Sequence, residues 1–161
     1  MISKAWRRLP TPSAGFSASL GLPAFHAHLL YNRGIRQRAE IDPFLKADSR
    51  LLNDPMLLPD MKKAVARLRK ALRAGETIGI FGDFDTDGVT GTALLAGALR
   101  DLGATVVTYI PDRVDEGHGL NEQAIRLLSD NSVSLLFTVD CGVTSIDEID
   151  YAASLGMDTI V

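Results

Sequence analysis

The chain contains a single cysteine, Cys141, among 161 residues. One thiol cannot form an internal disulfide, and it cannot build a zinc site of several cysteines. No apolar run approaches the roughly 18 residues that cross a membrane, which argues against a membrane-spanning segment and favours a cytoplasmic protein. Any metal bound here must therefore be held mainly by oxygen and histidine ligands.

Several catalytic signatures are also missing from the sequence. It has no G-x-x-x-x-G-K-[ST] phosphate-binding loop, no G-x-G-x-x-G dinucleotide fingerprint and no G-x-S-x-G nucleophile elbow. Cys141 follows Asp140 directly, and a neighbouring negative charge raises the pKa of a thiol. We therefore interpret this cysteine as a small packing residue rather than as a nucleophile.

The net charge of −3 conceals two regions of opposite charge. Residues 1–75 hold 14 Lys and Arg against 5 Asp and Glu, whereas residues 76–161 hold 3 against 15. A basic segment joined to an acidic one suits a protein that attracts a polyanion to a metal site. The alternative is that the basic residues only solvate helix faces. Both interpretations apply to the basic face of a helix predicted over 60–74, which carries Lys62, Lys63, Arg67, Arg69, Lys70 and Arg73.

Helices are predicted throughout the first 75 residues, and strands alternate with helices from Glu76 onward. Helical spacing and capping residues predict helices over 23–31, from Asp42-Pro43 onward, and over 60–74. Further along, strands are predicted at 77–81, 105–110, 133–139 and 158–161, and helices over 89–102, over 121–130 and from a Ser145/Glu148 capping box onward.

This pattern indicates an α/β fold, a parallel sheet with flanking helices, preceded by a small helical segment. We place the boundary after residue 75. Because the chain ends within an apolar strand that has no following helix to cover it, we expect 76–161 to be the first part of an incomplete domain.

Acidic residues follow the first and third predicted strands. The stretch "GDFDTDG" brings Asp83, Asp85 and Asp87 after one strand, and Asp140 follows another. The carboxyl ends of parallel strands meet at one edge of the sheet. If residues 83–87 stay extended, the three aspartates point to one side and repel one another and Asp140 unless a cation is present. Oxygen ligands suit Mg²⁺ or Mn²⁺. The alternative is an acidic turn at a helix N-terminus, where carboxylates are mildly favoured.

The loop after the second strand, "PDRVDEGHGL", supplies complementary groups. Arg113 can pair with a phosphate oxygen through its planar guanidinium, or it can form a salt bridge with an aspartate of its own loop. His118 could donate to a phosphate or be an ordinary loop residue. Gly117 and Gly119 would let the backbone approach a ligand closely.

These motifs together resemble the DHH phosphoesterase superfamily and, most closely, the RecJ family of single-stranded-DNA-specific exonucleases. The stretches "FGDFDTDGVTGTALL", "YIPDRVDEGHGL" and "TVDCGVTS" are similar to the first three family motifs, in the same order. The resemblance implies a DHH-type, Rossmann-like domain and a two-metal nuclease acting from the 5′ end of single-stranded DNA in repair and recombination. The implied cofactor is Mn²⁺ or Mg²⁺, and the implied partner is single-stranded DNA.

The resemblance also implies roles for individual residues. Asp85 and Asp87 match two catalytic metal ligands of the first motif, and Asp140 matches an aspartate able to bridge both metals. Asp83 matches a position that we expect to support the ligands without touching the metal. Arg113 matches a residue near the substrate phosphate.

Two departures from the family pattern limit what the chain is expected to do. Some superfamily members carry a metal-binding histidine four residues before the position of Asp85, where this chain has Phe81. The Asp-His-His motif that names the family is expected just beyond Val161, with the last ligand aspartate and the later substrate-binding domains. We therefore expect residues 1–161 to bind metal weakly and to have little or no nuclease activity.

Two other classes of protein remain open. The stretch "DTDGVT" resembles the motif of haloacid-dehalogenase-like phosphatases, in which Asp85 would be the nucleophile and Asp87 the general acid. A receiver-like or nucleotide-binding module could use the same acidic edge without catalysis. Both classes use a later lysine, and none follows Lys70.

Overall fold

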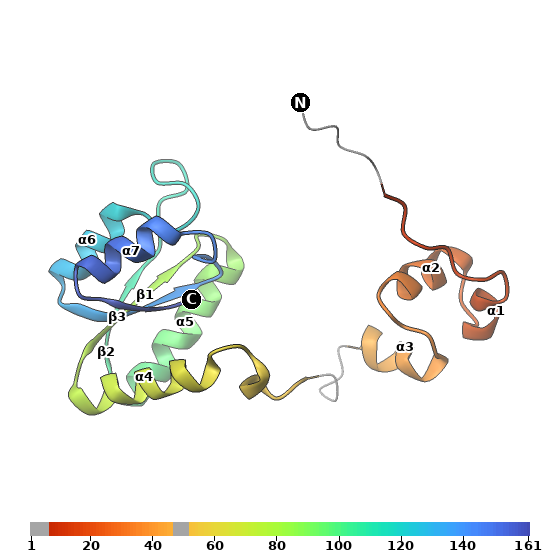
Figure 1. The fold of residues 1–161 in the computed structure, drawn as a ribbon, viewed down its shortest axis with the longest axis horizontal. Coiled ribbons are helices and arrows are strands. Elements are labelled where there is room, and N and C mark those ends of the chain that lie inside the picture. The colour runs from red at the N-terminus through yellow and green to blue at the C-terminus, as the bar shows by residue number, and fades with distance from the viewer. Residues whose placement is uncertain (1–6, 47–51) are drawn as a thin grey trace. The chain divides into compact units, whose positions relative to one another are not determined.

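The computed structural model describes residues 7–46 and 52–161, and the chain divides into two compact units, residues 1–57 and 58–161 (Figure 1). The division falls earlier than the boundary that we placed after residue 75. Helix α4 (Met61–Ala74) accounts for the difference, because its side chains Leu68, Ala71 and Leu72 belong to the core beneath the sheet. Among the described residues, every helix is too short or too polar to cross a membrane.

The first unit is helical, as the turn signals predict. It contains α1 (Phe16–Leu20), α2 (Ala24–Asn32), α3 (Arg38–Leu45) and the 3₁₀ turn η2 (Pro55–Leu57). Helix α3 begins four residues before Asp42, so the start predicted at Asp42-Pro43 is wrong. The carboxylate of Glu40 accepts hydrogen bonds from the backbone N–H groups of Arg36 and Gln37, which fixes the first turn upstream of Pro43.

The second unit is a four-stranded, all-parallel sheet with helices on both faces, which confirms the predicted fold class. The strands lie in the order β2-β1-β3-β4. In chain order the elements after α4 are β1 (Thr77–Gly82), α5 (Thr86–Asp101), β2 (Thr105–Tyr109), α6 (Glu122–Asp130), β3 (Val133–Val139), α7 (Ile146–Ser154) and β4 (Asp158–Ile160).

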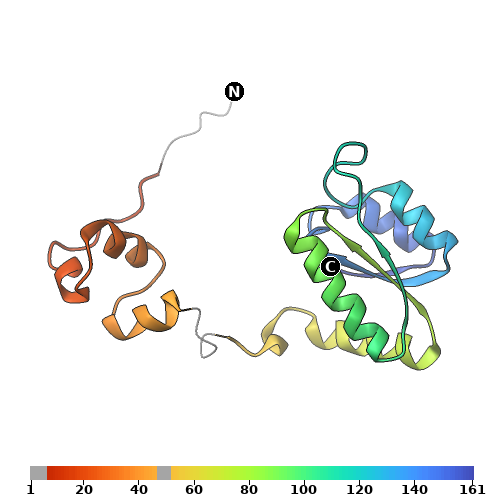
Figure 2. The ribbon, with the colours of Figure 1, turned by 180° about the vertical axis from the view of Figure 1, so that it is seen from behind.

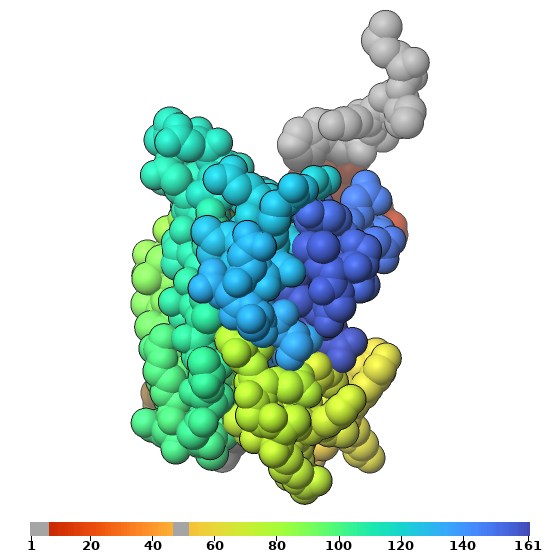
Figure 3. Space-filling model, turned by 90° about the vertical axis from the view of Figure 1, so that its left-hand side faces the viewer, coloured from red at the N-terminus to blue at the C-terminus, as the bar shows by residue number. Residues whose placement is uncertain are grey.

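Alternate residues of β1, the strand between β2 and β3, face opposite sides of the sheet and belong to two separate hydrophobic cores. Ile78 and Ile80 are fully buried against α4 and α5, whereas Phe81 is buried against α6 and α7. Figure 2 shows α5 across the first face, and Figure 3 shows α6 and α7 side by side over the second. This alternation is what the pleat of a strand covered on both sides requires.

Two helix starts differ from the predictions. Helix α5 begins at Thr86 rather than at residue 89, because Asp85 Oδ1 accepts from the N–H groups of Asp87 and Gly88 and caps the helix. The capping box predicted at Ser145 and Glu148 is wrong. Ser145 precedes α7 with ψ of 57° rather than an extended backbone, and its side chain makes no capping hydrogen bond. The helix predicted over 121–130 is confirmed, and Asn121 caps it, since its Oδ1 accepts from Ala124 N at 2.8 Å.

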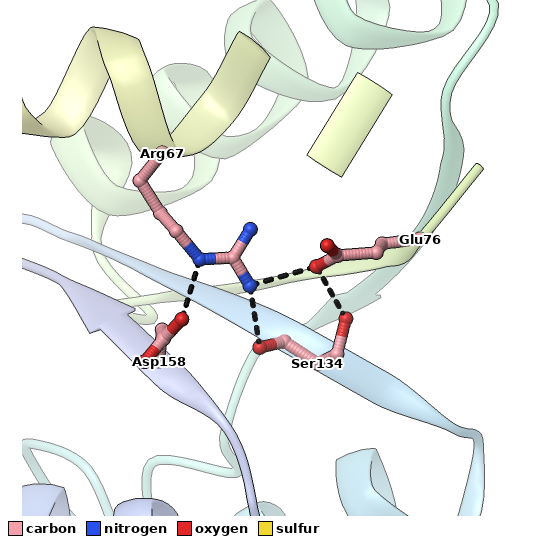
Figure 4. Close-up of polar contacts among 4 residues, drawn as sticks. All are labelled: Arg67, Glu76, Ser134 and Asp158. Atoms are coloured by element: carbon pink, nitrogen blue, oxygen red, sulfur yellow. Dashed lines mark hydrogen bonds and ion pairs between the residues drawn. The ribbon is translucent and has the colours of Figure 1, made fainter. Parts of the chain in front are cut away.

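At the amino ends of the strands, one arginine joins helix α4 to three strands' ends (Figure 4). Arg67 Nη2 donates to Glu76 Oε2 at 2.7 Å and to the Ser134 carbonyl at 3.3 Å, and Arg67 Nε donates to Asp158 Oδ2 at 2.5 Å. The side chain of Arg67 is only 18% exposed. Arg67 therefore does not belong with the other basic residues of α4, which stay exposed and keep both interpretations open: Lys62, Lys63, Arg69, Lys70 and Arg73.

Candidate active site

The order of the strands places a topological switch point at their carboxyl ends. The chain leaves β1 for β2 on one side and then crosses to β3 on the other, so the loops after β1 and β3 diverge at a topological switch point. Asp83 N donates to the Val139 carbonyl at 3.1 Å, which joins the first residue after β1 to the last residue of β3. The loop of residues 110–121 rises beyond the same edge (Figures 1 and 2). All three predicted motifs therefore meet at this edge.

The three aspartates of the first motif do not share one side, and that part of the prediction is wrong. Helix α5 begins between them, so Asp87 lies in its first turn, and both Asp85 and Asp87 are exposed. Asp83 is instead 6% exposed. Its Oδ2 lies 3.3 Å from His118 Nδ1, while its buried Oδ1 has no hydrogen-bond partner in the part of the chain that the structure describes.

Close backbone contact holds the start of α5 against the end of β1. A Cβ atom added to Gly88 would lie 2.2 Å from the Asp83 carbonyl oxygen and 2.5 Å from Asp83 N. One added to Gly82 would lie 1.9 Å from Thr92 Oγ1. Glycine at these two positions lets the amino end of the helix, which favours anions, reach the acidic edge.

The third motif turns sharply at its aspartate. Asp140 is exposed and has φ of 59°, a left-handed conformation that few residues other than glycine adopt. The next residue, Cys141, packs against the core beside Phe81. Burial, followed by the charges of Asp83 and Asp140, raises the pKa of the Cys141 thiol to about 11. This high pKa agrees with a packing role and not with that of a nucleophile.

The carboxylate oxygens of the acidic edge, the loops after β1 and β3, are donors of a kind that binds metal ions. This edge gathers carboxylates from two loops, and among the described residues no Lys or Arg forms an ion pair with Asp83, Asp85, Asp87 or Asp140. Hard divalent cations prefer such oxygen donors. However, no group of three or more His, Cys, Asp or Glu in residues 7–46 and 52–161 lies close enough together to hold a metal ion. The ligand set Asp85, Asp87 and Asp140 therefore stays a prediction.

An aromatic residue that sequence reasoning missed brings the second motif to this edge. The His118 ring lies 4.2 Å from the ring of Phe84, and the Arg113 guanidinium carbon lies 5.4 Å from the same ring centroid. Among the described residues no ion pair joins Arg113 to an aspartate of its own loop. The position of Phe84 between two aspartates in "DFD" was the only signal available in the sequence.

A second missed residue, Glu116, lies within the loop of residues 110–121. Its Oε1 accepts from Asp112 N at 2.8 Å, and its Oε2 accepts from the Tyr109 hydroxyl at 2.7 Å and from Asn121 Nδ2 at 3.0 Å. The hydrogen bond from Asp112 N, reinforced by Tyr109 and Asn121, lowers the pKa of Glu116. The same carboxylate, together with burial, raises the pKa of Tyr109 to about 12.

The fold and this edge define an α/β domain that presents acidic loops at a switch point of a parallel sheet. Residues 77–161 match the model of the DHH family, N-terminal domain, and the chain belongs to the DHH family.

Relatives of this chain are single-stranded-DNA-specific exonucleases named RecJ. The protein of Bacillus subtilis is 40% identical over 135 residues, which are 84% of this chain and 17% of that protein. The protein of Thermus thermophilus is 34% identical over 160 residues, which are 97% of this chain and 23% of that protein. The chain thus spans about a fifth of the length of these curated relatives.

Solved structures agree with this assignment. A crystal structure of exonuclease RecJ bound to manganese superposes with a TM-score of 0.60 at 39% identity, covering 65% of this chain and 27% of that one. RecJ of Thermus thermophilus in complex with Mn²⁺ gives a TM-score of 0.63 at 32% identity, covering 97% and 22%.

Proposed function

We propose that this chain contributes part of the catalytic domain of a metal-dependent exonuclease that hydrolyses single-stranded DNA from its 5′ end. The proposal includes a cytoplasmic location and a role in DNA repair and recombination. The observation that supports it most is the meeting of three loops at one switch point, with several carboxylates that pair with no Lys or Arg of residues 7–46 and 52–161. The names of the relatives and the manganese in their solved structures support the same activity.

In this proposal Asp85, Asp87 and Asp140 hold Mn²⁺ or Mg²⁺. Such ions, when bound, activate water and stabilise charge on the phosphate. Asp85 Oδ1 caps α5, which restrains this side chain, and Oδ2 would be the oxygen available to a metal ion. The buried carboxylate of Asp83 lies behind these groups and contacts His118.

The second motif binds the substrate in this proposal. The exposed guanidinium of Arg113 and the ring of His118 both lie beside Phe84, above the acidic edge. Arg113 would bind a phosphate oxygen through its planar group, and His118 would donate to another. Gly117 and Gly119, with φ of 77° and 89°, give this loop a backbone path that other residues rarely follow and leave room for the DNA backbone.

Metal binding can be tested by thermal unfolding of the chain with and without Mn²⁺. We expect weak binding that raises the melting temperature by a few degrees at millimolar Mn²⁺, because fewer than three ligands are gathered in advance in the described residues. Asp85→Asn should abolish the shift while keeping the helix cap, since asparagine caps as well as aspartate. Asp130→Asn, at the exposed end of α6, is the matched control and should leave the shift intact.

DNA binding can be tested by fluorescence anisotropy with a 5′-phosphorylated single-stranded oligonucleotide in Mn²⁺. We expect Mn²⁺-dependent binding, little or no cleavage, and an affinity about tenfold lower for Arg113→Ala. Equal binding of duplex and single-stranded DNA, or binding indifferent to Mn²⁺ and to Arg113, would contradict the proposal. An aspartyl-phosphate trapped on Asp85 would favour a phosphatase instead.

A further inference from the structure

The loop that carries Arg113 and His118 contains no helix or strand, so other contacts must fix its shape. Within residues 110–121 the backbone makes one tight turn, in which Glu116 N and Gly117 N donate to the Asp112 carbonyl at 3.0 and 3.2 Å. The Asp112 carboxylate accepts from Val114 N and Asp115 N at 2.8 and 3.1 Å. These bonds shape the turn but do not attach it to the sheet or to α6.

Glu116 makes that attachment at both ends of the loop. Through the Tyr109 hydroxyl it reaches the last residue of β2, whose ring stacks 5.6 Å from the fully buried ring of Phe81. Through Asn121 Nδ2 it reaches the residue whose Oδ1 caps α6. Its third bond, from Asp112 N, closes the turn in which Arg113 lies.

We propose that Glu116 is a positioning residue, which holds Arg113 and His118 over the acidic edge by anchoring their loop to β2 and α6. This role rests on the proposed function, because it matters to activity only if the loop binds the DNA phosphate. Glu116 lies on the loop between these two residues, and its carboxylate is bonded to Tyr109, Asp112 and Asn121 rather than to either of them. It therefore acts on the substrate only through its neighbours.

The contacts require a carboxylate and not merely a polar side chain. Three donors, from Tyr109, Asp112 and Asn121, converge on the two oxygens of Glu116. A glutamine offers one acceptor oxygen and places an N–H group against at least one of those donors, which leaves a partly buried donor without a partner. Glu116→Gln should therefore release one end of the loop while preserving side-chain volume.

The test is a mutant cycle on the whole chain, measured as affinity for the 5′-phosphorylated single-stranded oligonucleotide in Mn²⁺. Glu116→Gln should weaken binding about tenfold when Arg113 and His118 are present and less than about twofold when both are alanine, because it acts through these two residues. The matched control is Glu122→Gln, an exposed glutamate at the start of α6, which should change binding less than about twofold in either background. If Glu116→Gln only destabilised the fold, the affinity for the oligonucleotide would fall by the same factor in both backgrounds.

Equal weakening in both backgrounds, or no weakening, would overturn the positioning role while leaving the proposed function in place. If the unmodified chain shows no Mn²⁺-dependent DNA binding, the proposed function fails instead. Hydrogen exchange then decides the anchoring by itself, without DNA. The amides of Asp112, Glu116 and Gly117 should exchange at least about tenfold faster in Glu116→Gln and at the original rate in Glu122→Gln. Unchanged exchange in Glu116→Gln would refute the anchoring.

Discussion

The two ends of the same sheet treat carboxylates in opposite ways. At the amino ends of the strands, Glu76 and Asp158 both form ion pairs with Arg67, which is largely buried. At the carboxyl ends, Asp83, Asp85 and Asp140 lie on two loops that a backbone hydrogen bond from Asp83 N to the Val139 carbonyl joins, and within the described residues no Lys or Arg pairs with these aspartates. The sheet supports both arrangements within the length of a few residues, for example between Glu76 and Asp83 on either side of β1.

The acids at the amino ends stabilise the fold through ion pairs, whereas the acids at the carboxyl ends form no ion pair with a Lys or Arg of the described residues. A paired carboxylate contributes to stability, whereas like charges without a basic partner repel one another and cost free energy, which an added cation would offset. Sites of the second kind are where function is expected, because natural sequences give up local stability there and recover it elsewhere. The following substitutions should change the two ends differently.

The largest effect is expected from Gly88→Ala at the carboxyl edge. The added methyl group would overlap backbone atoms of Asp83 at 2.2 to 2.6 Å, so α5 must move away from β1 and the free energy of unfolding should fall by about 3 kcal/mol. Gly97→Ala on the same helix is the control, because its Cβ meets no atom within 4 Å and should stabilise the helix by about 0.5 to 1 kcal/mol. Urea unfolding measures both. A loss below about 1 kcal/mol for Gly88→Ala would mean that this contact relaxes at little cost.

Arg67→Met should have the next largest effect, at the amino edge. It leaves Glu76, whose side chain is 19% exposed, without its partner, and we expect a loss of about 2 kcal/mol at pH 7. Arg69→Met, on an exposed position of α4, should change stability by less than about 0.5 kcal/mol.

The same pair predicts a pH dependence. The hydrogen bond from Arg67, together with that from Ser134, lowers the pKa of Glu76 from 4.5 in the folded state. A lowered carboxyl pKa contributes stability that is present above the unfolded value and is lost as pH falls through the folded one. The difference between the original chain and Arg67→Met should therefore shrink as the pH falls below about 4.5. A difference that does not change with pH would contradict the assignment of this pair.

The smallest effect on the free energy of unfolding is expected from neutralising one aspartate at each edge, and the two changes should have opposite signs. Asp140→Asn should raise the free energy of unfolding by about 0.5 kcal/mol without metal, because it removes repulsion and because asparagine tolerates the left-handed backbone. It should also abolish the stabilisation by Mn²⁺. Asp158→Asn, which loses its bond from Arg67 but is 65% exposed, should lower stability by about 0.5 kcal/mol. If both substitutions changed the free energy of unfolding in the same direction, the proposed difference between the two edges would be wrong.

Sequence periodicity was sufficient for the α/β class and for the place of each strand, because buried strands and amphipathic helices leave patterns in neighbouring residues. The order of the strands was not predictable in this way. That β1 lies between β2 and β3 depends on pairing between residues far apart in the chain, such as Ile78 with Val106 and with Leu135. The pattern did place the loops after these strands at one edge, because the carboxyl ends of parallel strands meet there.

Individual side-chain contacts were not predictable from the sequence. The charge of Asp85 suggested a metal ligand, which stays a prediction, but it did not show that Asp85 also caps α5 and ends the extended segment. Arg67 was counted with a basic face because helical spacing does not tell which of several arginines meets Glu76 at the start of β1. Glu116 gave no signal, since contacts within an irregular loop leave no periodic pattern, even though its three donors are near it in the chain.

The glycines of "GDFDTDG" have a consequence for how such sequences are recognised. Gly82 and Gly88 carry no group that could take part in chemistry, and both are needed because atoms of Thr92 and of Asp83 occupy the space where a side chain would begin. A descendant that lost every carboxylate proposed here to bind metal would still need these glycines to close the junction between β1 and α5. The two glycines of the motif therefore reflect close packing between β1 and α5 and not chemistry. They would be kept in an inactive descendant as readily as in an enzyme.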